Sequence, residues 1–522
     1  MTKPRNILFV TTDQQRWDAL GCNGGAVART PAVDALAAAG VRYARPHVQN
    51  VVCMPSRATM VTGQYPRTHG VVCNGVALPE RTPTVVRALA DAGYHTGLVG
   101  KAHFDPLLDL RRRFAQNRLA GEGSTGPWLG FDRVELAVHA PIPTTHYGRY
   151  LAREHPRELL GFGWVLSGFG GGDTSAPEVK TNPIPRELYH TDWVRDRAEA
   201  FLRAHDPRRP FFLWASFPDP HHPWDPPASE RRRVPWRDLR LPPGHPGADA
   251  RRVLAGKPRH WLDWYEGRFH NPEGGSSRFV PARLRDDQVR EVNALVHVEN
   301  ELIDEAVGRL VAVLRERGLD AHTDVVFTSD HGELQGDFGL LFKGPYHVDA
   351  LLRVPLIWRP APSAGIAPTV VPEPVGLVDL APTFCQIAGL EVPPWMEGAP
   401  LPTAAGSSRR YVLSEWDSQF RRVGMHLRTM FEDRWLVTRY LASTHDEGGR
   451  FPILEATLAR PGVVPHYTGA EGELYDVVDD PGQRINLWDS PRHRRTRDDL
   501  LAAMNARLPR GRPTPLPVSA PV

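Results

Sequence analysis

The chain has 522 residues, of which 41% are hydrophobic and 24% charged, and this ordinary composition excludes a collagen-like or wholly disordered protein. Its 63 basic and 60 acidic residues nearly cancel, so the charge indicates neither nucleic acid nor an anionic membrane as a partner. No window approaches the roughly 20 apolar residues of a membrane span. Because no signal-peptide core precedes the first predicted strand, we expect a cytoplasmic protein.

Short apolar runs that end in polar loops predict buried strands, at residues 6–11, 96–99, 211–216 and 325–329. A helix is predicted at residues 31–39, which begin with Pro and are followed by Gly40. A longer amphipathic helix, with an interruption left open, is predicted at residues 284–317. This alternation predicts an α/β fold with a mostly parallel sheet covered on both faces. Ligands of such sheets gather outside the carboxyl ends of the strands.

Two segments interrupt this pattern. Residues 106–185 and 231–275 are rich in Gly, Pro and Arg, and we expect them to form long loops over the site. The tryptophans in and near these segments either form an aromatic wall for a cationic or aryl group or pack in loops or between subunits; they are Trp128, Trp164, Trp224, Trp236, Trp261 and Trp264.

The composition changes again after about residue 409, where shorter alternating segments predict a smaller antiparallel domain. We therefore divide the chain into a larger α/β domain, residues 1–405, and a smaller domain, residues 406–522. The Pro-rich end of the chain suits an arm that reaches a neighbouring subunit, so we expect a homo-oligomer.

One of the four cysteines stands in the densest motif of the chain. Cys53 begins the run Cys-Met-Pro-Ser-Arg-Ala-Thr-Met-Val-Thr-Gly, which ends at Gly63. Pro55 lies where a helix can begin and Gly63 where it can end, so Cys53 is expected at a helix N-terminus. Unpaired N–H groups there favour an anion and a thiolate. The alternative is a buried, inert cysteine that precedes an ordinary helix.

The pattern Cys-x-Pro-Ser-Arg followed by Ala-x-x-x-Thr-Gly resembles the motif of the sulfatases in the alkaline phosphatase superfamily. The resemblance implies an alkaline-phosphatase-like fold, in which helices sandwich a mixed, mostly parallel sheet and a smaller antiparallel sheet domain lies C-terminal. It also implies that a separate formylglycine-generating enzyme oxidises Cys53 to formylglycine (3-oxoalanine). Matching motifs extend to Glu473-Leu474-Tyr475-Asp476, which resembles a strand of the family's small domain.

Acidic residues follow two of the predicted strands. Asp13 comes after the first strand and Asp330-His331 after the strand at residues 325–329, so both acids would project into one crevice. By resemblance these positions, together with Cys53, bind the metal.

Two departures from the common family pattern bear on the metal. The pair after the first strand is Thr12-Asp13, with only one carboxylate, and Asp330-His331 stands where many sulfatases have Asp-Asn. Both features resemble the choline-sulfatase and phosphonate monoester hydrolase branch. Carboxylate oxygens with an imidazole nitrogen favour one Mn²⁺ ion, with Ca²⁺ and Mg²⁺ as alternatives.

Two further motifs carry histidines. Gly100-Lys101-Ala102-His103 resembles the family's Gly-Lys-x-His element. The resemblance implies that Lys101 binds the sulfate oxygens and that His103 takes the proton that lets the covalent sulfate depart. The run Pro-His-His-Pro resembles the Pro-His-x-Pro segment, and its register selects His221 as the residue that contacts substrate.

Three more residues are assigned by resemblance. Lys343 lies thirteen residues after Asp330, in the place of the family's second catalytic lysine. Only five of the basic residues are lysines, and two of these fall on predicted catalytic positions. Asn74 aligns with a substrate-contacting Asn of the choline-sulfatase branch, although an Asn-Gly turn explains it almost as well. Arg57 would hold the formylglycine and neutralise charge, the alternative being a salt bridge within its own helix.

The resemblance implies a sulfuric ester hydrolase that acts on a small organic sulfate, aryl or alkyl. Hydrated formylglycine at position 53 would attack sulfur, Lys343 and His221 would protonate or stabilise the leaving alkoxide, and His103 would help to expel sulfate. One alternative is a phosphonate monoester or phosphodiester hydrolase with the same formylglycine site, against which the charges of Lys101 and His103 argue. Another is a non-catalytic anion-binding protein that keeps the pocket.

Overall fold

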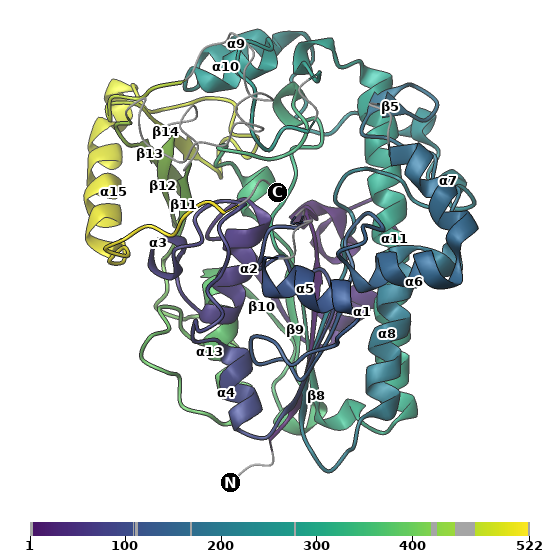
Figure 1. Cartoon of the computed structure of the whole chain (residues 1–522). Helices are drawn as coiled ribbons and strands as arrows, with labels where there is room; N and C mark the ends of the chain where they lie inside the picture. Colours follow the sequence, from purple (N-terminus) through teal and green to yellow (C-terminus); the bar gives the residue numbers. More distant parts are fainter. Residues whose placement is uncertain are drawn as a thin grey trace.

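The computed structural model describes residues 4–107, 109, 113–166, 170–275, 278–418, 425–443 and 465–519. Its centre is an eight-stranded sheet with the order β10-β2-β9-β8-β1-β7-β3-β4 (Figure 1). Strand β9 is antiparallel to both of its neighbours, and the other pairs are parallel. The strands are β1 (Asn6–Thr12), β2 (Val41–His47), β3 (His95–Gly100), β4 (Arg133–Leu136), β7 (Phe211–Ser216), β8 (Thr323–Ser329), β9 (Leu356–Arg359) and β10 (Thr369–Gly376).

Both faces of this sheet are buried. On β1, Ile7 and Phe9 belong to one hydrophobic core, whereas Leu8 and Val10 belong to another, because successive side chains of a strand point to opposite faces. Helices cover the two faces (Figure 1). The first core contains residues of α2 (Cys53–Thr62), α4 (Val85–Asp91) and α13 (Leu380–Ala388), and the second contains residues of α1 (Pro31–Ala38), α8 (His190–Ala204) and α11 (Asp286–Glu316).

The regular elements that the sequence predicts are confirmed. The four apolar runs form β1, β3, β7 and β8. These strands are consecutive in the sheet, in the order β8-β1-β7-β3. The long amphipathic segment forms α11 as a single helix of 31 residues without interruption. Its apolar residues, spaced three and four apart, bury one side against the sheet and against α8, which is what holds so long a helix in place.

The prediction of long loops at residues 106–185 is wrong. This segment contains α5 (Ala115–Glu122), the edge strand β4, α6 (His146–Glu154) and α7 (Pro156–Leu166). In α6 the Thr145 side chain caps the first turn by accepting from the N–H of Gly148, and Tyr147 and Leu151 are buried. A high content of Gly, Pro and Arg concealed this short amphipathic pattern.

Residues 231–275 fit the expectation of a covering segment better, since they hold only two short α-helices, α9 (Ala250–Ala255) and α10 (His260–Tyr265). The remaining short elements are α3 (Pro66–His69), α12 (Asp349–Leu352), β5 (Gly170–Gly171) and β6 (Ala176–Pro177). Among the described residues, no helix has both the length and the apolar character that crossing a membrane requires.

A second, four-stranded antiparallel sheet follows the first, as predicted. It consists of β11 (Tyr411–Asp417), β12 (His426–Glu432), β13 (Trp435–Tyr440) and β14 (Gly472–Asp476), and α15 (Arg494–Arg507) packs on it. The extended tail then lies against its own chain, since the N–H of Arg512 donates to Arg67 O and that of Ser519 to Gly75 O, both at 2.8 Å. The described part of the tail is therefore not an arm that leaves its own subunit.

Candidate active site

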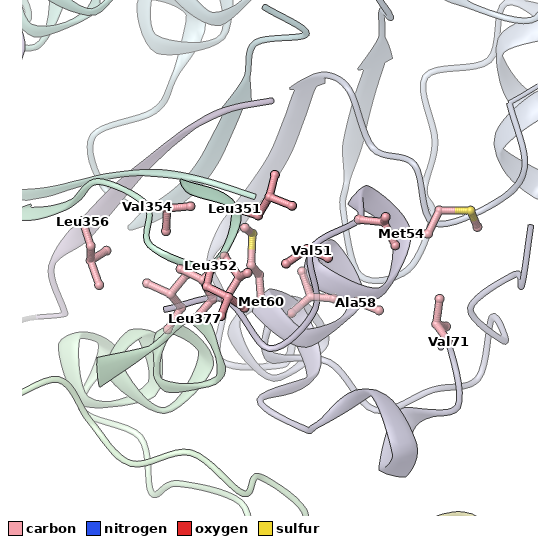
Figure 2. Close-up of a cluster of buried hydrophobic side chains, with 14 of the residues drawn as sticks. Val51, Met54, Ala58, Met60, Val71, Leu351, Leu352, Val354, Leu356 and Leu377 are labelled. Carbon is pink, nitrogen blue, oxygen red and sulfur yellow. The ribbon is translucent and has the colours of Figure 1, made fainter. Parts of the chain in front are cut away.

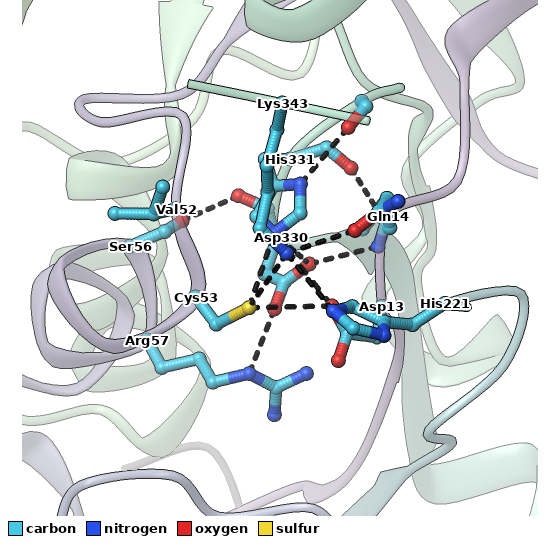
Figure 3. A network of polar contacts seen from close by, with 12 residues as sticks. Asp13, Gln14, Val52, Cys53, Ser56, Arg57, His221, Asp330, His331 and Lys343 are labelled. Carbon is cyan, nitrogen blue, oxygen red and sulfur yellow. Dashed lines mark hydrogen bonds and ion pairs between the residues drawn. The ribbon is translucent and has the colours of Figure 1, made fainter. Parts of the chain in front are cut away.

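The predicted site residues meet at the carboxyl edge of the central sheet (Figure 3). Asp13 follows β1, Asp330 and His331 follow β8, and Lys101 follows β3. Because β1 lies between β7 and β8 in parallel register, these strand ends are neighbours in space. Helix α2 brings Cys53 to the same place at its first residue.

Packing fixes the position of α2. All ten of its residues are buried, and apolar side chains such as Ala58 and Met60 lie against Leu351, Leu352 and Leu377 (Figure 2). Gly63 ends the helix with a φ of 66°, a left-handed conformation that glycine adopts without strain. The expected position of the cysteine at a helix N-terminus is therefore confirmed.

Four side chains form a candidate metal centre. The ligand atoms of Asp13, Cys53, Asp330 and His331 lie within 4.8 Å of one another, and all four residues are buried. Nε2 of His331 is 3.2 Å from the Cys53 Sγ and 3.6 Å from Oδ1 of Asp13. Its other ring nitrogen, Nδ1, lies 2.9 Å from Gly332 O, a bond that turns Nε2 toward the cluster.

The chemistry of this donor set fits a divalent cation. Burial lowers the pKa of the His331 imidazole to about 4, so at neutral pH its Nε2 carries a free electron pair. Two buried carboxylates, Asp13 and Asp330, supply oxygen ligands and negative charge. Oxygen donors with one imidazole nitrogen suit Mn²⁺, Ca²⁺ or Mg²⁺ more than a thiolate-seeking metal.

The thiol of Cys53 is not activated by its surroundings. Burial, with Asp13 nearby, raises its pKa to about 12, and the opposing charges of Lys101 and Lys343 do not compensate. The expectation that the helix N-terminus favours a thiolate is wrong here, because burial and the neighbouring Asp13 carboxylate favour the neutral thiol. The unmodified cysteine is therefore protonated at neutral pH and is a weak nucleophile.

Cationic groups surround that Sγ. The Nζ of Lys101 lies 3.7 Å from it and forms an ion pair with Asp13, and the Nζ of Lys343 lies 3.5 Å from it. Both lysines are buried. Two buried ammonium groups beside one atom form a site for a tetrahedral anion.

Arg57 completes the positive side of the site. Its Nε donates to Oδ2 of Asp330 at 2.8 Å, and its Nη1 donates to Lys101 O and to Ser216 Oγ at 2.6 and 2.9 Å. Its Nη2 is buried without a hydrogen-bond partner in the part of the chain that the structure describes. The alternative of a salt bridge within its own helix is therefore wrong, since the partner comes from the end of β8.

Both predicted histidines reach the site. Nε2 of His221 lies 2.9 Å from the Lys343 Nζ, and burial together with Lys343 holds its pKa well below the usual range. Neither ring nitrogen of His103 has a hydrogen-bond partner among the described residues. Burial, reinforced by Lys101, holds the pKa of His103 well below its usual value. Both imidazoles are therefore neutral, and His103 is free to accept a proton.

Sequence reasoning missed Gln14. The residue beside Asp13 that enters the site is Gln14, whereas the Thr12 hydroxyl bonds to Gln15 and Thr328 O. The Gln14 N–H donates to Oδ1 of Asp330 at 3.1 Å, and its Oε1 accepts from the Lys343 Nζ at 2.8 Å. The signal that could have identified Gln14 is its place just after β1, since the first residues past the carboxyl edge of the sheet face the crevice.

Two more residues near the site were missed. His139, just past β4, stacks on His221 with ring centroids 4.5 Å apart. Glu273 accepts from the Nδ2 of Asn74 at 3.1 and 3.3 Å. Asn74 also caps the first turn of α2, because its Oδ1 accepts from the Met54 N–H at 3.0 Å.

The tryptophans favour packing over an aromatic wall. Four of the six are buried in the protein interior: Trp128, Trp224, Trp261 and Trp264. Trp236 is half-buried and donates to Asp173 at 2.9 Å. The side chain of Trp164 lies outside the described residues.

Taken together, a carboxylate-rich metal centre, a buried cysteine at a helix N-terminus and two ammonium groups beside it define a hydrolase site for a tetrahedral anion. The sulfatase family model matches residues 5–129 and 142–390. This is more than half of the chain, so the chain belongs to the sulfatase family of the alkaline phosphatase superfamily, hydrolases that act on sulfuric esters.

Two relatives agree with this assignment, and a solved structure shares the fold. The chain is 28% identical over 507 residues to the uncharacterized sulfatase YidJ of Escherichia coli (strain K12), covering 97% of this chain and 87% of YidJ. It is 29% identical over 419 residues to an arylsulfatase of Clostridium perfringens, covering 76% and 77%. The phosphonate monoester hydrolase of Silicibacter pomeroyi has the same fold, with a TM-score of 0.71, 24% identity and coverage of 96% and 94%.

Proposed function

We propose that this chain hydrolyses small organic sulfate esters, aryl or alkyl, with formylglycine at position 53 and one divalent metal ion. The observation that carries the proposal is the surroundings of the Cys53 Sγ. Within 3.2 to 3.7 Å of it lie the Nε2 of His331, the Oδ1 of Asp13 and the Nζ atoms of Lys101 and Lys343. One atom is thus in contact with both candidate metal ligands and two ammonium groups.

Asp13, Asp330, His331 and the converted side chain at position 53 would hold the metal. We favour Mn²⁺ because one imidazole joins the oxygen ligands, with Ca²⁺ and Mg²⁺ as alternatives. The ion supplies positive charge that lowers the cost of the anionic transition state. Arg57 positions Asp330 through its Nε, and its free Nη2 is the donor that would contact the oxygen at position 53.

The proposed reaction has two steps. In the first, the hydrated formylglycine at position 53 would supply the nucleophile: one of its hydroxyls would give its proton to the Asp13 carboxylate, which accepts from the Cys53 Sγ in this structure, and its oxygen would bond to sulfur as the bond from sulfur to the alcohol oxygen breaks. Lys343, oriented by His221, gives that oxygen a proton. In the second, the neutral His103 takes the proton of the remaining hydroxyl, the bond from carbon to the sulfate oxygen breaks, and sulfate leaves as the aldehyde re-forms.

Lys101 and Lys343 would bind the sulfate oxygens throughout, because both are buried next to the nucleophile. The charge expected on His103 from the sequence is absent, because its imidazole is neutral. The preference for sulfate therefore rests on the two ammonium groups, which complement the compact sulfate group better than a phosphonate with a carbon substituent. This favours sulfate esters over the phosphonate monoesters of the structural neighbour.

The test is peptide mass spectrometry of the segment with Cys53, from protein made with and without a formylglycine-generating enzyme. We expect an aldehyde at position 53 and hydrolysis of 4-nitrophenyl sulfate in proportion to its fraction, faster than hydrolysis of 4-nitrophenyl phenylphosphonate. Cys53→Ala should lose this activity, whereas Cys22→Ser, at a half-buried cysteine outside the site, should keep it. Faster phosphonate hydrolysis, or aldehyde-bearing protein without sulfatase activity, would contradict the proposal.

A further inference from the structure

An acidic residue lies beside the sulfate-binding side of the site, where the proposed reaction has no use for it. Glu273 comes from the covering segment, residues 231–275, and accepts from the Asn74 Nδ2 at 3.1 and 3.3 Å. The same Asn74 side chain accepts from the Met54 N–H, one residue after Cys53. A single amide therefore connects the Glu273 carboxylate to the first turn of α2.

A second link holds Glu273 from the opposite side. The Oδ1 of Asn271 accepts from the Glu273 N–H at 3.1 Å, and its Nδ2 donates to Lys343 O at 2.6 Å. The carboxylate thus stands between the two loops, those of Asn74 and Lys343, that flank the nucleophile position.

The turn that carries Glu273 is also tightly packed. A Cβ added at Gly274 would lie 3.0 Å from the Trp264 ring, and one added at Gly275 would lie 2.8 Å from the Phe342 ring. Gly275 has a φ of +70°, which other residues adopt only with strain. The carboxylate is held in one place by its surroundings, as a residue that selects ligands must be.

The charge of Glu273 is the opposite of what sulfate requires. Burial raises the pKa of its carboxyl, while Lys343 and the hydrogen bond from Asn74 counteract that rise. Glu273 is half-buried, so part of its surface remains accessible. A carboxylate accepts hydrogen bonds and donates none, and it repels a second anion. Its natural partner is a donor on the organic half of the substrate.

We propose that Glu273, positioned by Asn74, is a specificity residue that accepts a hydrogen bond from a hydroxyl or ammonium group close to the ester oxygen. This inference rests on the proposed sulfatase activity and narrows its substrates to sulfate esters of polyols or amino alcohols. It also predicts that esters with a second anionic group near the sulfate are poor substrates, because that group would meet the carboxylate.

The test compares three esters of equal chain length that differ in one terminal group: 2-aminoethyl sulfate, 2-hydroxyethyl sulfate and propyl sulfate. The readout is kcat/KM from sulfate release by the formylglycine-bearing protein. We expect the esters with a donor to exceed propyl sulfate by about tenfold or more, the usual effect of a hydrogen bond to a charged acceptor. A higher kcat/KM for 2-aminoethyl sulfate alone would identify esters of amino alcohols as substrates. An equal increase for 2-aminoethyl and 2-hydroxyethyl sulfate would identify esters of polyols.

Glu273→Gln keeps an oxygen for Asn74 and removes the charge. We expect it to lower the ammonium preference about tenfold and to change 4-nitrophenyl sulfate hydrolysis less than about threefold. Glu273→Asp should restore part of the preference. Asp238→Asn, at an exposed acid of the same covering segment, should change none of the ratios.

Two results would overturn the role of Glu273 and leave the proposed sulfatase function intact. One is equal kcat/KM for the three esters in the unaltered protein, and the other is a Glu273→Gln variant that slows all three by one common factor. The latter would give Glu273 a purely structural role. Absence of 4-nitrophenyl sulfate hydrolysis by protein that carries the aldehyde would instead overturn the proposed sulfatase function, and this inference with it. The two failures are therefore distinguishable.

Discussion

The side-chain nitrogen of Lys343 lies 2.9 Å from Nε2 of His221, although 122 residues separate them along the chain. An ammonium group can only donate, so the imidazole must accept through Nε2. Burial and the adjacent Lys343 keep the pKa of His221 well below its usual range. The pair therefore carries one transferable proton at neutral pH, and that proton belongs to the lysine.

The pair of Lys343 and His221 predicts that the loss of kcat/KM in variants of either residue depends on the leaving group. Lys343→Met and His221→Ala should lower kcat/KM for alkyl sulfates by about 10²- to 10⁴-fold, the usual contribution of a proton donor. The loss for 4-nitrophenyl sulfate should be smaller, because nitrophenolate leaves without a proton. The measurement is the slope of log kcat/KM against leaving-group pKa across a series of sulfate esters. Lys257→Met, which removes a buried lysine next to β14, should leave the slope unchanged, and an equal loss for all esters would contradict the assignment.

The metal centre predicts that binding and stability are coupled. Mn²⁺ at about a hundred times its Kd should raise the free energy of unfolding by about 2.7 kcal/mol. Asp13→Asn and His331→Ala should weaken Mn²⁺ binding by about a hundredfold or more, since the first removes the negative charge of an oxygen ligand and the second removes the nitrogen ligand. Titration calorimetry and denaturation with and without Mn²⁺ measure the two effects. His322→Ala, at an exposed histidine, serves as the control, and unchanged affinity in both ligand variants would contradict the site.

Lys257 predicts a dependence of stability on pH. Its Nζ donates to Gln483 O at 2.8 Å and lies 4.5 Å from the centre of the Trp261 ring. Burial lowers its pKa from 10.5 to about 8, so between these values the unfolded chain binds more protons than the folded one. The free energy of unfolding therefore rises with pH across this window.

Relative to Lys257→Met, the unaltered protein should gain as much as about 3 kcal/mol between about pH 7 and pH 10. Urea denaturation of both proteins across this range measures the difference. A difference between the two proteins that does not change with pH would show that Lys257 does not lose its proton in the folded state.

The surroundings of Gly100, the residue before Lys101, predict that a side chain at this position clashes with the neighbouring strand. Its φ is +103°, and an added Cβ would lie 1.8 Å from Ser216 O on the neighbouring strand β7. Gly24 has a similar φ of +96° with nothing within 4 Å, so it is a matched control for backbone strain alone. Gly24→Ala should cost about 1 kcal/mol, whereas Gly100→Ala should cost about 3 kcal/mol and lower kcat/KM by displacing Lys101. Equal losses of stability in urea denaturation would contradict the steric argument.

Much of the site was predictable because its residues follow local signals. Asp13, Lys101 and Asp330 each come directly after an apolar run that forms a parallel strand, and such strand ends share one edge of the sheet. Cys53 and Gly63 mark the two ends of α2 within a single motif. The local order of residues placed them at the ends of strands and of one helix, and the resemblance to the sulfatases gave them their roles.

The sequence by itself therefore determined the α/β class, the main strands and the motif residues, whereas only the tertiary structure decided how they are coupled. Gln14 accepts from Lys343 across 329 residues, and Glu273 from Asn74 across 199. The protonated state of the Cys53 thiol likewise follows from burial by distant segments. No local pattern encodes these properties, because desolvation and long-range hydrogen bonds exist only once the chain has packed.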